Sequence, residues 1–592
     1  MTILDLPKPV IKSRQRNPVI EQQGLAAGLD PVIARIIAGR PIRADLPPLQ
    51  ALSPKLKQLD VPHSMMDMNK AAERIAQAIM QGECIGIETD HDCDGQTSHA
   101  VLHYNLINRF GHPAEKVRSY IGHRLIEGYG LSESVASRIL ADVPLSSLVI
   151  TADNGSSDEP RLARLKNAGI DVIITDHHEI PIEGHPVSAY ACLNPTREDC
   201  SYGDPYIAGC MVAWLLMAAT RQQLIDLGYL AKETPSLIDS LDFVAVGTIA
   251  DCVSIARSTN NRAVVSYGLQ LIEKGVRPCW RAIKADLNRK ITSEDLSFKI
   301  GPLLNSDGRL ASALGSVSFL LTETDEEALE WIASLRGQNE ERKLIQKTIV
   351  QQGLHVASKQ VIEGRFALCI YLPEGHPGVH GIAASRIKEL FGRPTAFFAP
   401  KAGNQNLITG SVRGLEGFHV RDALQMVANQ NPNLLIAFGG HVGAGGLTLK
   451  AQDFEAFSFS FEAATRQQLS SESIGPVIWT DGELSAANLN LKFLDKLSLL
   501  EPFGREFESP LFETEATLKQ LRVVGDGTHA RVLLEIDGLR VSGIWFGMRQ
   551  SEKAPMPVIA GERVKVVYSL RENLYQGNRS LDVLVNSLTS VR

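Results

Sequence analysis

The chain has 592 residues, 44% of them hydrophobic, so it can bury more than one core and is expected to fold as several domains. No apolar run approaches the roughly 20 residues that cross a bilayer, and no basic segment leads into an apolar one at the N-terminus. The sequence therefore predicts a cytoplasmic protein without a membrane partner. A formal net charge of −7 argues against a protein that coats nucleic acid with its whole surface, and eight cysteines without a Cys-x-x-Cys pair indicate neither a zinc ribbon nor a disulfide framework.

The first half of the chain predicts an α/β fold. Residues 1–50, rich in proline and arginine, form an irregular or partly helical extension to which no function is assigned. In residues 51–325, short apolar runs alternate with helical patterns, as in a doubly wound parallel sheet joined by crossover helices. The clearest predicted strands are Cys84–Ile87, Ser147–Thr151 and Asp171–Thr175.

The second half predicts three further segments. Residues 326–362 read as a charged connecting helix, and residues 363–468 as a smaller α/β domain with two glycine-rich stretches. Residues 469–592 form a last domain. From about residue 510 its short strands and its Gly-Asp-Gly and Asp-Gly turns indicate a β-barrel of the OB type.

Three aspartates follow the first predicted strand. Asp90, Asp92 and Asp94 stand at alternate positions, and Gly95 permits a tight turn into the next helix. Three like charges near the end of a buried strand repel one another unless a cation neutralises them. A solvated Asp-rich turn would be the better interpretation if this motif stood alone.

Neighbouring strands end in similar residues. Asp153 follows the second strand, and Asp176, His177 and His178 follow the third, at the sheet edge where ligands bind in open α/β folds. Asp251 ends another apolar stretch. The alternative for Asp251 is a helix cap, but its small and apolar neighbours favour a buried ligand.

The donor set is mostly oxygen with one imidazole nitrogen, from Asp90, Asp92, Asp153, His177 and Asp251. Such a set suits manganese or magnesium better than zinc. Two such cations can activate water and stabilise the attacking and leaving oxygens on phosphorus, so phosphodiester hydrolysis is the natural reaction.

The order of aspartate triplet, single Asp, Asp-His-His and later Asp resembles the DHH phosphoesterases. The resemblance implies that the five donors bind two divalent cations, Mn²⁺ or Mg²⁺. It also implies that Asp94, Asp176 and His178 support the site or contact phosphate, completing a catalytic set with Asp153 and His177.

From about residue 55 to the C-terminus the chain is similar to the RecJ family within that group. The resemblance implies an exonuclease that degrades single-stranded DNA from 5′ to 3′ in DNA repair and recombination. It further implies a monomer whose partners include a helicase and a single-strand binding protein.

Family motifs also imply a set of nucleic-acid-binding residues. Arg124 and Tyr129 lie in a loop placed beside the DNA end, where an arginine fork suits phosphate and a tyrosine stacks on a base, although an ordinary surface turn is the alternative. Asn305 and Arg309 belong to a motif near the scissile strand. The remaining candidates are Ser385, Arg386, Ser411, Arg413, His441, Arg531 and Trp545.

Ser411, Arg413 and His441 would form the pocket for a terminal phosphate in the family arrangement. Trp545 and the neighbouring Phe546 offer stacking surface in the barrel, with barrel core as an equally good interpretation.

Three positions depart from the family pattern. Glu88 stands where relatives often have histidine, His91 where an aromatic residue is usual, and Leu303 where an arginine is usual, so one phosphate contact can be missing. None of these changes removes a carboxylate ligand.

Two alternative functions stay open. The first is a DHH phosphodiesterase acting on oligoribonucleotides or cyclic dinucleotides, but those proteins are generally shorter and lack the terminal barrel. The second is a weakly catalytic scaffold that binds DNA or replication proteins. The intact carboxylates argue against it, because a binding module gains nothing from clustered buried acids.

Overall fold

The computed structural model describes residues 6–310, 312–549, 551–575 and 577–591. The chain divides into two compact units. The terminal unit comprises residues 1–52, 390–392 and 475–592, and the central unit comprises residues 53–389 and 393–474. Within the described residues, no helix combines the length and the apolar character that crossing a membrane requires.

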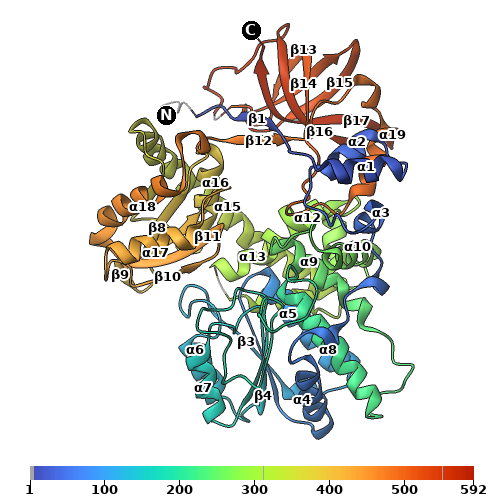
Figure 1. The fold of residues 1–592 in the computed structure, drawn as a ribbon, viewed down its shortest axis with the longest axis vertical. Helices are drawn as coiled ribbons and strands as arrows, with labels where there is room; N and C mark the ends of the chain where they lie inside the picture. Colours follow the sequence, from blue (N-terminus) through green and yellow to red (C-terminus); the bar gives the residue numbers. More distant parts are fainter. Residues whose placement is uncertain (1–5, 311, 550, 576, 592) are drawn as a thin grey trace. The chain divides into compact units, whose positions relative to one another are not determined.

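The first sheet of the central unit has five parallel strands in the order β3-β2-β4-β5-β6 (Figure 1). The strands are β2 (Ile85–Thr89), β3 (Val117–Ile121), β4 (Leu148–Ala152), β5 (Asp171–Thr175) and β6 (Ala191–Leu193). The order changes direction between β2 and β4, and in open α/β sheets ligands bind outside the carboxyl ends of strands at such a point.

Helices cover both faces of this sheet, which confirms the doubly wound prediction. Alternate strand residues such as Val149 and Val172 pack with Val135 of α6 (Glu133–Ala141) and Leu162 of α7 (Glu159–Asn167). The opposite face carries α4 (Met68–Gln81), α5 (Cys93–Tyr104) and α8 (Gly209–Asp226), which pack against one another and the strands.

A helical layer follows the sheet along the chain. It contains α9 (Leu241–Ala250), α10 (Thr259–Lys274), α11 (Pro278–Leu287), α12 (Ser293–Asp295), α13 (Gly301–Leu310) and α14 (Leu314–Leu320). The helix α15 (Asp325–Ile362) then spans 38 residues, as its charged helical pattern predicts. It begins where the Thr324 hydroxyl accepts a hydrogen bond from the Glu327 amide (3.3 Å).

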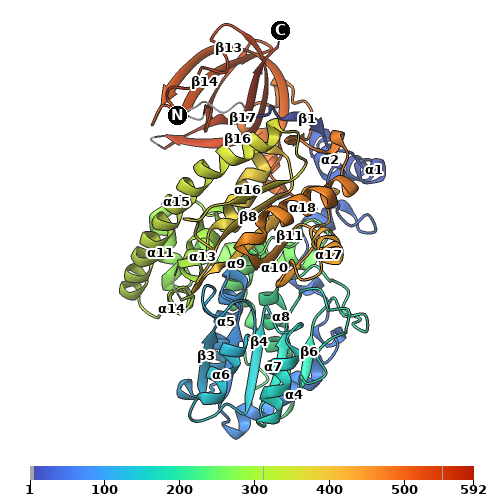
Figure 2. The same cartoon turned by 90° about the vertical axis from the view of Figure 1, so that its left-hand side faces the viewer.

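The second sheet of the central unit is mixed, in the order β10-β11-β9-β8-β7 (Figure 2). Its strands are β7 (Leu368–Tyr371), β8 (Thr395–Lys401), β9 (Asn404–Arg413), β10 (Ala437–Gly440) and β11 (Ala444–Lys450). Phe398 and Val412 pack on one face with α17 (Val420–Gln430) and α18 (Phe454–Gln468). On the other face, Phe397 meets α16 (His380–Phe391) and α15 around Gly353.

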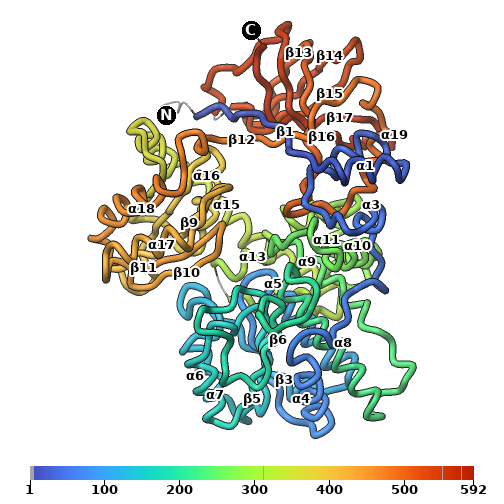
Figure 3. The backbone as a smooth tube through the Cα atoms, in the orientation of Figure 1, coloured from blue at the N-terminus to red at the C-terminus, as the bar shows by residue number. Residues whose placement is uncertain are grey.

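The terminal unit contains a closed five-stranded barrel, as the turn pattern predicts, in the order β13-β14-β15-β17-β16. Its strands are β13 (Phe512–Val524), β14 (His529–Ile536), β15 (Leu539–Trp545), β16 (Arg563–Tyr575) and β17 (Asn578–Ser590). The N-terminal strand β1 (Val10–Ser13) pairs in parallel with β12 (Val477–Thr480), so the start of the chain joins the segment that precedes the barrel (Figure 3).

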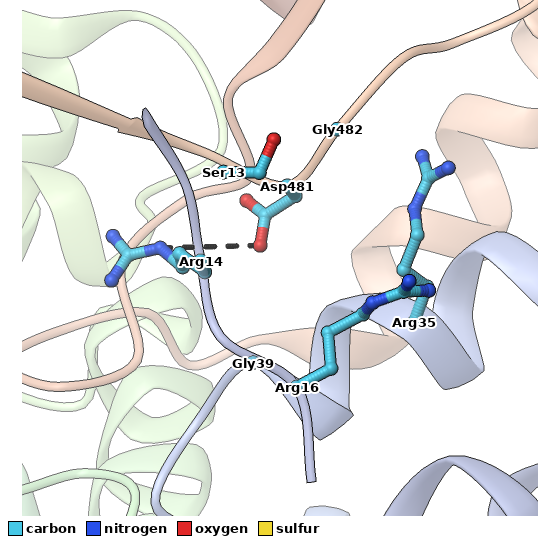
Figure 4. A pocket seen from close by; sticks show the side chains of 7 residues that line it. All are labelled: Ser13, Arg14, Arg16, Arg35, Gly39, Asp481 and Gly482. Carbon is cyan, nitrogen blue, oxygen red and sulfur yellow. Dashed lines mark ion pairs between the residues drawn. The ribbon is translucent and has the colours of Figure 1, made fainter. Parts of the chain in front are cut away.

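Ion pairs fasten the N-terminal segment to the rest of the terminal unit. The segment contains α1 (Pro18–Ala26), α2 (Pro31–Ala38) and α3 (Pro48–Leu52). Both Asp481 oxygens accept from the Arg40 guanidinium (2.7 and 3.1 Å), with side chains only 0% and 2% exposed. Arg14 lies 4.0 Å from the same carboxylate at the edge of a cavity of about 160 Å³, which Arg35 also lines (Figure 4).

Candidate active site

The first acidic turn folds around the start of α5. Asp92 is the N-cap of this helix, and its Oδ1 accepts hydrogen bonds from the Asp94 and Gly95 amides (3.0 and 3.2 Å). A Cβ atom on Gly95 would lie 2.2 Å from the Asp90 carbonyl oxygen, so only glycine fits there. The turn therefore holds Asp90 and Asp92 beside each other at the carboxyl end of β2.

Asp153 occupies a left-handed backbone conformation, with φ of 62°, directly after β4. Its amide donates to the Thr175 carbonyl (2.8 Å), and Gly209 of α8 packs so closely that an added Cβ would lie 2.9 Å from the Asp153 Cβ. A non-glycine residue with positive φ persists where its surroundings hold it, and such positions cluster at functional sites.

His177 lies at the centre of the carboxylates. Its Nε2 is 3.2 Å from Asp153 Oδ1, 3.5 Å from Asp251 Oδ2 and 3.8 Å from Asp94 Oδ2. His177 follows β5, Asp153 follows β4, Asp251 follows α9, and Asp94 lies in the first turn of α5. Four elements that are separated in sequence therefore bring side chains to one point.

Asp94 and Asp176 are already engaged within the protein. Asp94 accepts from the amides of Gly209 and Cys210 (2.7 and 3.1 Å), the first two residues of α8. Asp176 accepts from Ser156 N (3.0 Å), from His177 N (2.8 Å) and from His178 Nδ1 (2.7 Å). Asp94 therefore caps the start of α8, and Asp176 holds the turn that carries His177 and His178.

The donor atoms form three overlapping groups, each with its atoms within 4.8 Å of one another. The groups are Asp90 with Asp92 and Asp153, Asp94 with His177 and Asp251, and Asp153 with His177 and His178. Because Asp153 and His177 link the groups, the arrangement fits two neighbouring cations bound by oxygen and imidazole ligands.

The electrostatics of the carboxylates agree with this fit. Burial, followed by repulsion from Asp94 and Asp92, raises the pKa of Asp153 well above its usual value. The same causes raise the pKa of Asp251, which lies at the C-terminal end of α9, where the helix dipole also disfavours negative charge. Ionised together, these groups need positive charge between them.

The two histidines differ in charge. Burial, and then the positive His178, lowers the pKa of His177 to about 4, so its imidazole is neutral at pH 7 and keeps a lone pair. Burial alone would lower the pKa of His178, but the Asp176 carboxylate outweighs it and raises the pKa to about 10. His178, paired with Asp176 through its Nδ1 (2.7 Å), is therefore positively charged at pH 7.

The three departures from the family pattern lie in buried surroundings. Glu88 on β2 is 0% exposed, and burial, followed by the Asp158 carboxylate, raises its pKa well above the usual value. The His91 ring lies 2.9 Å from Asp90 Oδ1 and contacts the Tyr129 ring, with centroids 4.8 Å apart. Leu303 packs into the interior on α13.

Cationic side chains gather next to the carboxylate edge. Arg124 lies over the Tyr129 ring at 5.1 Å. Arg309 of α13 donates to the Gly378 carbonyl (3.1 Å), which joins the first sheet's helical layer to the second α/β domain. Burial, and then the positive Arg124, lowers the pKa of Arg309 to about 9.

The second α/β domain contributes the other side of this cationic cluster. Arg413 donates to the Ser411 hydroxyl (2.6 Å), and a Cβ on Gly381 would lie 3.0 Å from both side chains. Burial lowers the pKa of Arg413, and Arg124 lowers it further. The His441 ring stacks on His178 with centroids 5.6 Å apart, which brings His441 to the candidate site.

Some predicted binding residues have other contacts. Asn305 Oδ1 accepts from the Cys93 amide (2.9 Å) and so contacts the start of α5. The Ser385 hydroxyl donates to Gly381 O (3.2 Å) within α16, and the exposed Arg386 pairs with Glu389 (3.4 Å). No signal in the sequence distinguishes the positioning role of the Asn305 amide from a binding role.

The barrel candidates lie in the terminal unit. Arg531 is exposed on β14, directly opposite Arg522 on β13. Trp545 is only 7% exposed and belongs to the barrel core, whereas Phe546 is 56% exposed and packs edge-on against His529. On β15, Gly543, Ile544 and Trp545 are all buried, so the strand's alternation between inward and outward side chains is broken there. Of the two neighbouring aromatic residues, Phe546 is therefore the one that offers an exposed ring.

A doubly wound sheet with an oxygen-rich cluster and a cationic cluster at its carboxyl edge defines a class, that of phosphoesterases built for divalent cations. Three family models match the chain. They are the DHH family N-terminal domain over residues 84–248, the DHHA1 domain over residues 364–467 and the RecJ OB domain over residues 480–587.

Similar proteins extend this result to the whole chain. The single-stranded-DNA-specific exonuclease RecJ of Dickeya dadantii is 34% identical over 98% of this chain and 99% of its own length. The protein of the same description from Escherichia coli is 34% identical over 97% and 98%. RecJ of Thermus thermophilus, solved in complex with Mn²⁺, matches with a TM-score of 0.78 at 25% identity, covering 98% of this chain and 79% of that chain. The chain belongs to the RecJ family of single-stranded-DNA-specific exonucleases.

Proposed function

We propose that this protein hydrolyses single-stranded DNA from its 5′ end, using divalent cations to cut phosphodiester bonds. The observation that carries the proposal is the convergence of Asp153 and Asp251 within 3.5 Å of the His177 Nε2 atom, beside an arginine cluster. Relatives of nearly equal length are named as exonucleases specific for single-stranded DNA, which supports the same substrate.

Manganese or magnesium is the proposed cofactor, because the donor atoms are hard oxygens with one neutral imidazole. Asp90, Asp92 and Asp153 would hold one ion, and Asp153, His177 and Asp251 a second. When bound, such a pair supplies an activated water and stabilises the attacking and leaving oxygens on phosphorus. The solved RecJ of Thermus thermophilus contains Mn²⁺, which supports this assignment.

The chain's own cations would orient the strand. Arg413, Ser411 and Arg124 are proposed to hold the terminal 5′ phosphate, since the arginine fork matches phosphate oxygens. This capture sets which phosphodiester reaches the carboxylate edge, so mononucleotides leave one at a time from the 5′ end.

Arg309 and His178 are proposed to contact the phosphate that is cut. Both carry positive charge at neutral pH, and the contact of Asp176 with His178 Nδ1 (2.7 Å) leaves the opposite ring nitrogen as a second donor. The neighbouring Tyr129 ring would stack on a base, a contact that tolerates any sequence.

The other proposed properties rest on the family. We propose action in repair and recombination, in the cytoplasm, as a monomer, together with a helicase and a single-strand binding protein. A phosphodiesterase for oligoribonucleotides or cyclic dinucleotides is disfavoured by the OB barrel that the chain carries. A weakly catalytic scaffold is disfavoured by the intact carboxylate cluster.

A digestion assay tests the proposed function. Strands of 20 nucleotides are offered with Mn²⁺ as 5′-phosphorylated single strands, as blunt duplexes and as dinucleotides, with the label at either end. We expect 5′-labelled single strands to release labelled mononucleotide at once, while 3′-labelled strands shorten gradually. Early release of mononucleotide from the 3′ label, or cleavage of the duplex or dinucleotide alone, contradicts the proposal.

A further inference from the structure

The N-terminal segment, for which the sequence predicts no function, forms one wall of a cavity inside the terminal unit. The cavity has a volume of about 160 Å³ and lies between this segment and the turn that follows β12. The described residues that line it are three arginines, one aspartate, one serine and two glycines, so no apolar side chain faces the cavity. Figure 4 shows Arg14 on one side of Asp481, with Arg16 and Arg35 on the other.

The single acidic side chain of the lining is already neutralised. Both Asp481 oxygens accept from the Arg40 guanidinium (2.7 and 3.1 Å), and Oδ2 also accepts from the Leu511 amide (3.1 Å). Arg40 and Asp481 therefore form a buried pair that fixes the base of the cavity. The three arginines of the lining depend on other partners for their neutralisation.

Two of these arginines pair with carboxylates at exposed positions. Arg14 Nη2 lies 3.0 Å from Glu508 Oε2, and Arg16 Nη1 lies 3.1 Å from Glu21 Oε1. The Arg16 side chain is 53% exposed. Exposed ion pairs contribute little to stability, so Arg16 can exchange the Glu21 carboxylate for another anion at low cost.

Arg35 of α2 is the cation of the lining that no carboxylate among the described residues pairs with. Its Nη2 donates to a main-chain carbonyl, that of Glu483 (2.6 Å), and its Nε is buried without an acceptor in the described part of the chain. The guanidinium lies against Gly482, because an added Cβ there would be 3.6 Å from Arg35 Cζ. A charged group with an unused buried donor is costly unless a ligand supplies the acceptor.

The chemistry of the lining favours a phosphate group as that ligand. A guanidinium fork presents paired donors to phosphate oxygens, and Arg16 and Arg35 come from different segments. Phosphate oxygens are arranged tetrahedrally and can be contacted from two directions, whereas the two oxygens of a carboxylate share one plane. A cavity of roughly 150 Å³ can hold a benzene ring, so the space is sufficient for one phosphate group.

We propose that this cavity binds a phosphate group, with Arg35 and Arg16 as its ligands and the Arg40–Asp481 pair as its fixed base. The phosphate belongs either to the backbone of a single strand or to a released mononucleotide, which present the same chemistry to the two arginines. All residues of the site belong to the terminal unit, so it is a different site from the carboxylate edge. The inference goes beyond the proposed function, because it concerns binding and not cleavage.

The competing explanation is that Arg16 and Arg35 only fasten the N-terminal segment. The two explanations differ in the response to phosphate. A ligand that binds the folded protein raises its melting temperature, and removal of a ligand-binding side chain reduces that rise. Removal of a fastening side chain lowers the melting temperature by the same amount with and without phosphate.

The experiment compares the full-length wild type with Arg35→Gln, Arg16→Gln and the matched control Arg43→Gln, all in EDTA so that no strand is cut. Arg43 lies in the same segment and pairs with Asp45 at the surface (2.6 Å). Thermal melting is followed with inorganic phosphate or thymidine monophosphate, against acetate at equal ionic strength. Fluorescence anisotropy measures binding of a strand of 40 thymidine nucleotides over a series of KCl concentrations.

We expect Arg35→Gln and Arg16→Gln each to weaken binding of the phosphate-bearing probe about tenfold, the loss of one charge-assisted contact. If the phosphate belongs to a strand, the negative slope of log affinity against log salt concentration also falls by about 0.7. If it belongs to a mononucleotide, the loss appears with thymidine monophosphate and inorganic phosphate alone. Phosphate bound elsewhere contributes equally to all four proteins, and Arg43→Gln should match the wild type.

Equal responses of all four proteins to phosphate, mononucleotide and strand would overturn the inference and leave Arg16 and Arg35 as structural residues. If Arg35→Gln does not fold, the exposed Arg16→Gln decides the matter alone. A wild-type protein that binds phosphate through these arginines but cuts no DNA supports this inference and refutes the proposed function, so the two failures can be distinguished.

Discussion

Buried charges are treated differently in two regions of this molecule. In the terminal unit, Arg40 and Asp481 are both buried and neutralise each other at 2.7 Å. At the carboxyl edge of the first sheet, Asp92, Asp153 and Asp251 lie among like charges, and Arg309 lies among other arginines. Internal pairing holds a structure together, whereas buried charge of one sign prepares a site for a ligand of the other sign.

The strongest test of this contrast is Asp153→Asn. Asparagine tolerates the left-handed backbone at this position, so the substitution removes mainly charge. We expect cleavage of single-stranded DNA in Mn²⁺ to fall by about a thousandfold, the several kcal/mol that charge stabilisation at a metal site supplies.

The same variant should not lose stability when metal is removed. Because Asp153 is repelled by Asp94 and Asp92, the metal-free melting temperature should stay the same or rise. A variant that melts earlier in EDTA and still cuts DNA would place Asp153 among structural residues and remove the distinction between the two regions.

The opposite behaviour is expected of Asp481→Ala in the terminal unit. Arg40 would be left buried without its partner, and breaking such a pair costs about 3–5 kcal/mol of unfolding free energy. Urea denaturation measures this loss. The control is Asp45→Ala, which removes an exposed ion pair with Arg43 and should leave the urea midpoint where it is. Equal midpoints for the two variants would contradict a structural role for Asp481.

The cationic cluster is tested by Arg413→Gln. If Arg413 holds a terminal phosphate, the variant should lose about tenfold in kcat/KM on 5′-phosphorylated strands, one charge-assisted contact, and little on 5′-hydroxyl strands. The control is Lys401→Gln, an exposed residue at the end of β8. An equal loss on both strands would show that Arg413 does not recognise the terminal phosphate.

A smaller effect, a pH dependence of the unfolding free energy, is expected from Asp176 and His178, which pair with each other at the carboxylate edge. The folded pKa of His178, about 10, lies above the ordinary value of 6.5. Its contribution to stability is therefore complete below about pH 6.5 and is lost as the pH rises towards 10. In EDTA, the unfolding free energy of the wild type should fall more steeply between pH 7 and 10 than that of His178→Gln, as measured by urea denaturation. Parallel slopes would contradict the raised pKa.

Much of the first sheet could be predicted because an apolar strand that runs into acidic residues indicates both the fold and the position of the candidate site. Parallel strands share their carboxyl edge, so Asp90, Asp153 and His177 had to lie near one another once the strands were recognised. Two of the three predicted strands differ from the observed ones by one or two residues at their ends, and the third, Asp171–Thr175, matches at both ends. The long helix begins one residue before the predicted segment 326–362 and ends with it.

Other features depend on contacts that a sequence does not display. The pairing of β1 with β12 joins residues more than 460 positions apart, and no pattern in the first 50 residues indicates which strand they pair with. Arg342 resembles the other charged residues of α15, and only burial distinguishes it. In the barrel, alternation fails at Gly543–Trp545, so which of Trp545 and Phe546 points outward could not be read from the strand pattern.

The most direct test is the number of Mn²⁺ ions that the full-length protein binds. This number is measured by calorimetric titration after the metal has been removed with EDTA, and it decides whether cations bind at the carboxylate edge. The carboxylates and the imidazole that meet at the end of β4 predict two ions per chain, and they predict that Asp153→Asn weakens both, because Asp153 belongs to two of the three donor groups. A wild-type protein that binds no Mn²⁺, or a variant that binds it as the wild type does, would contradict the presence of a metal centre at this edge.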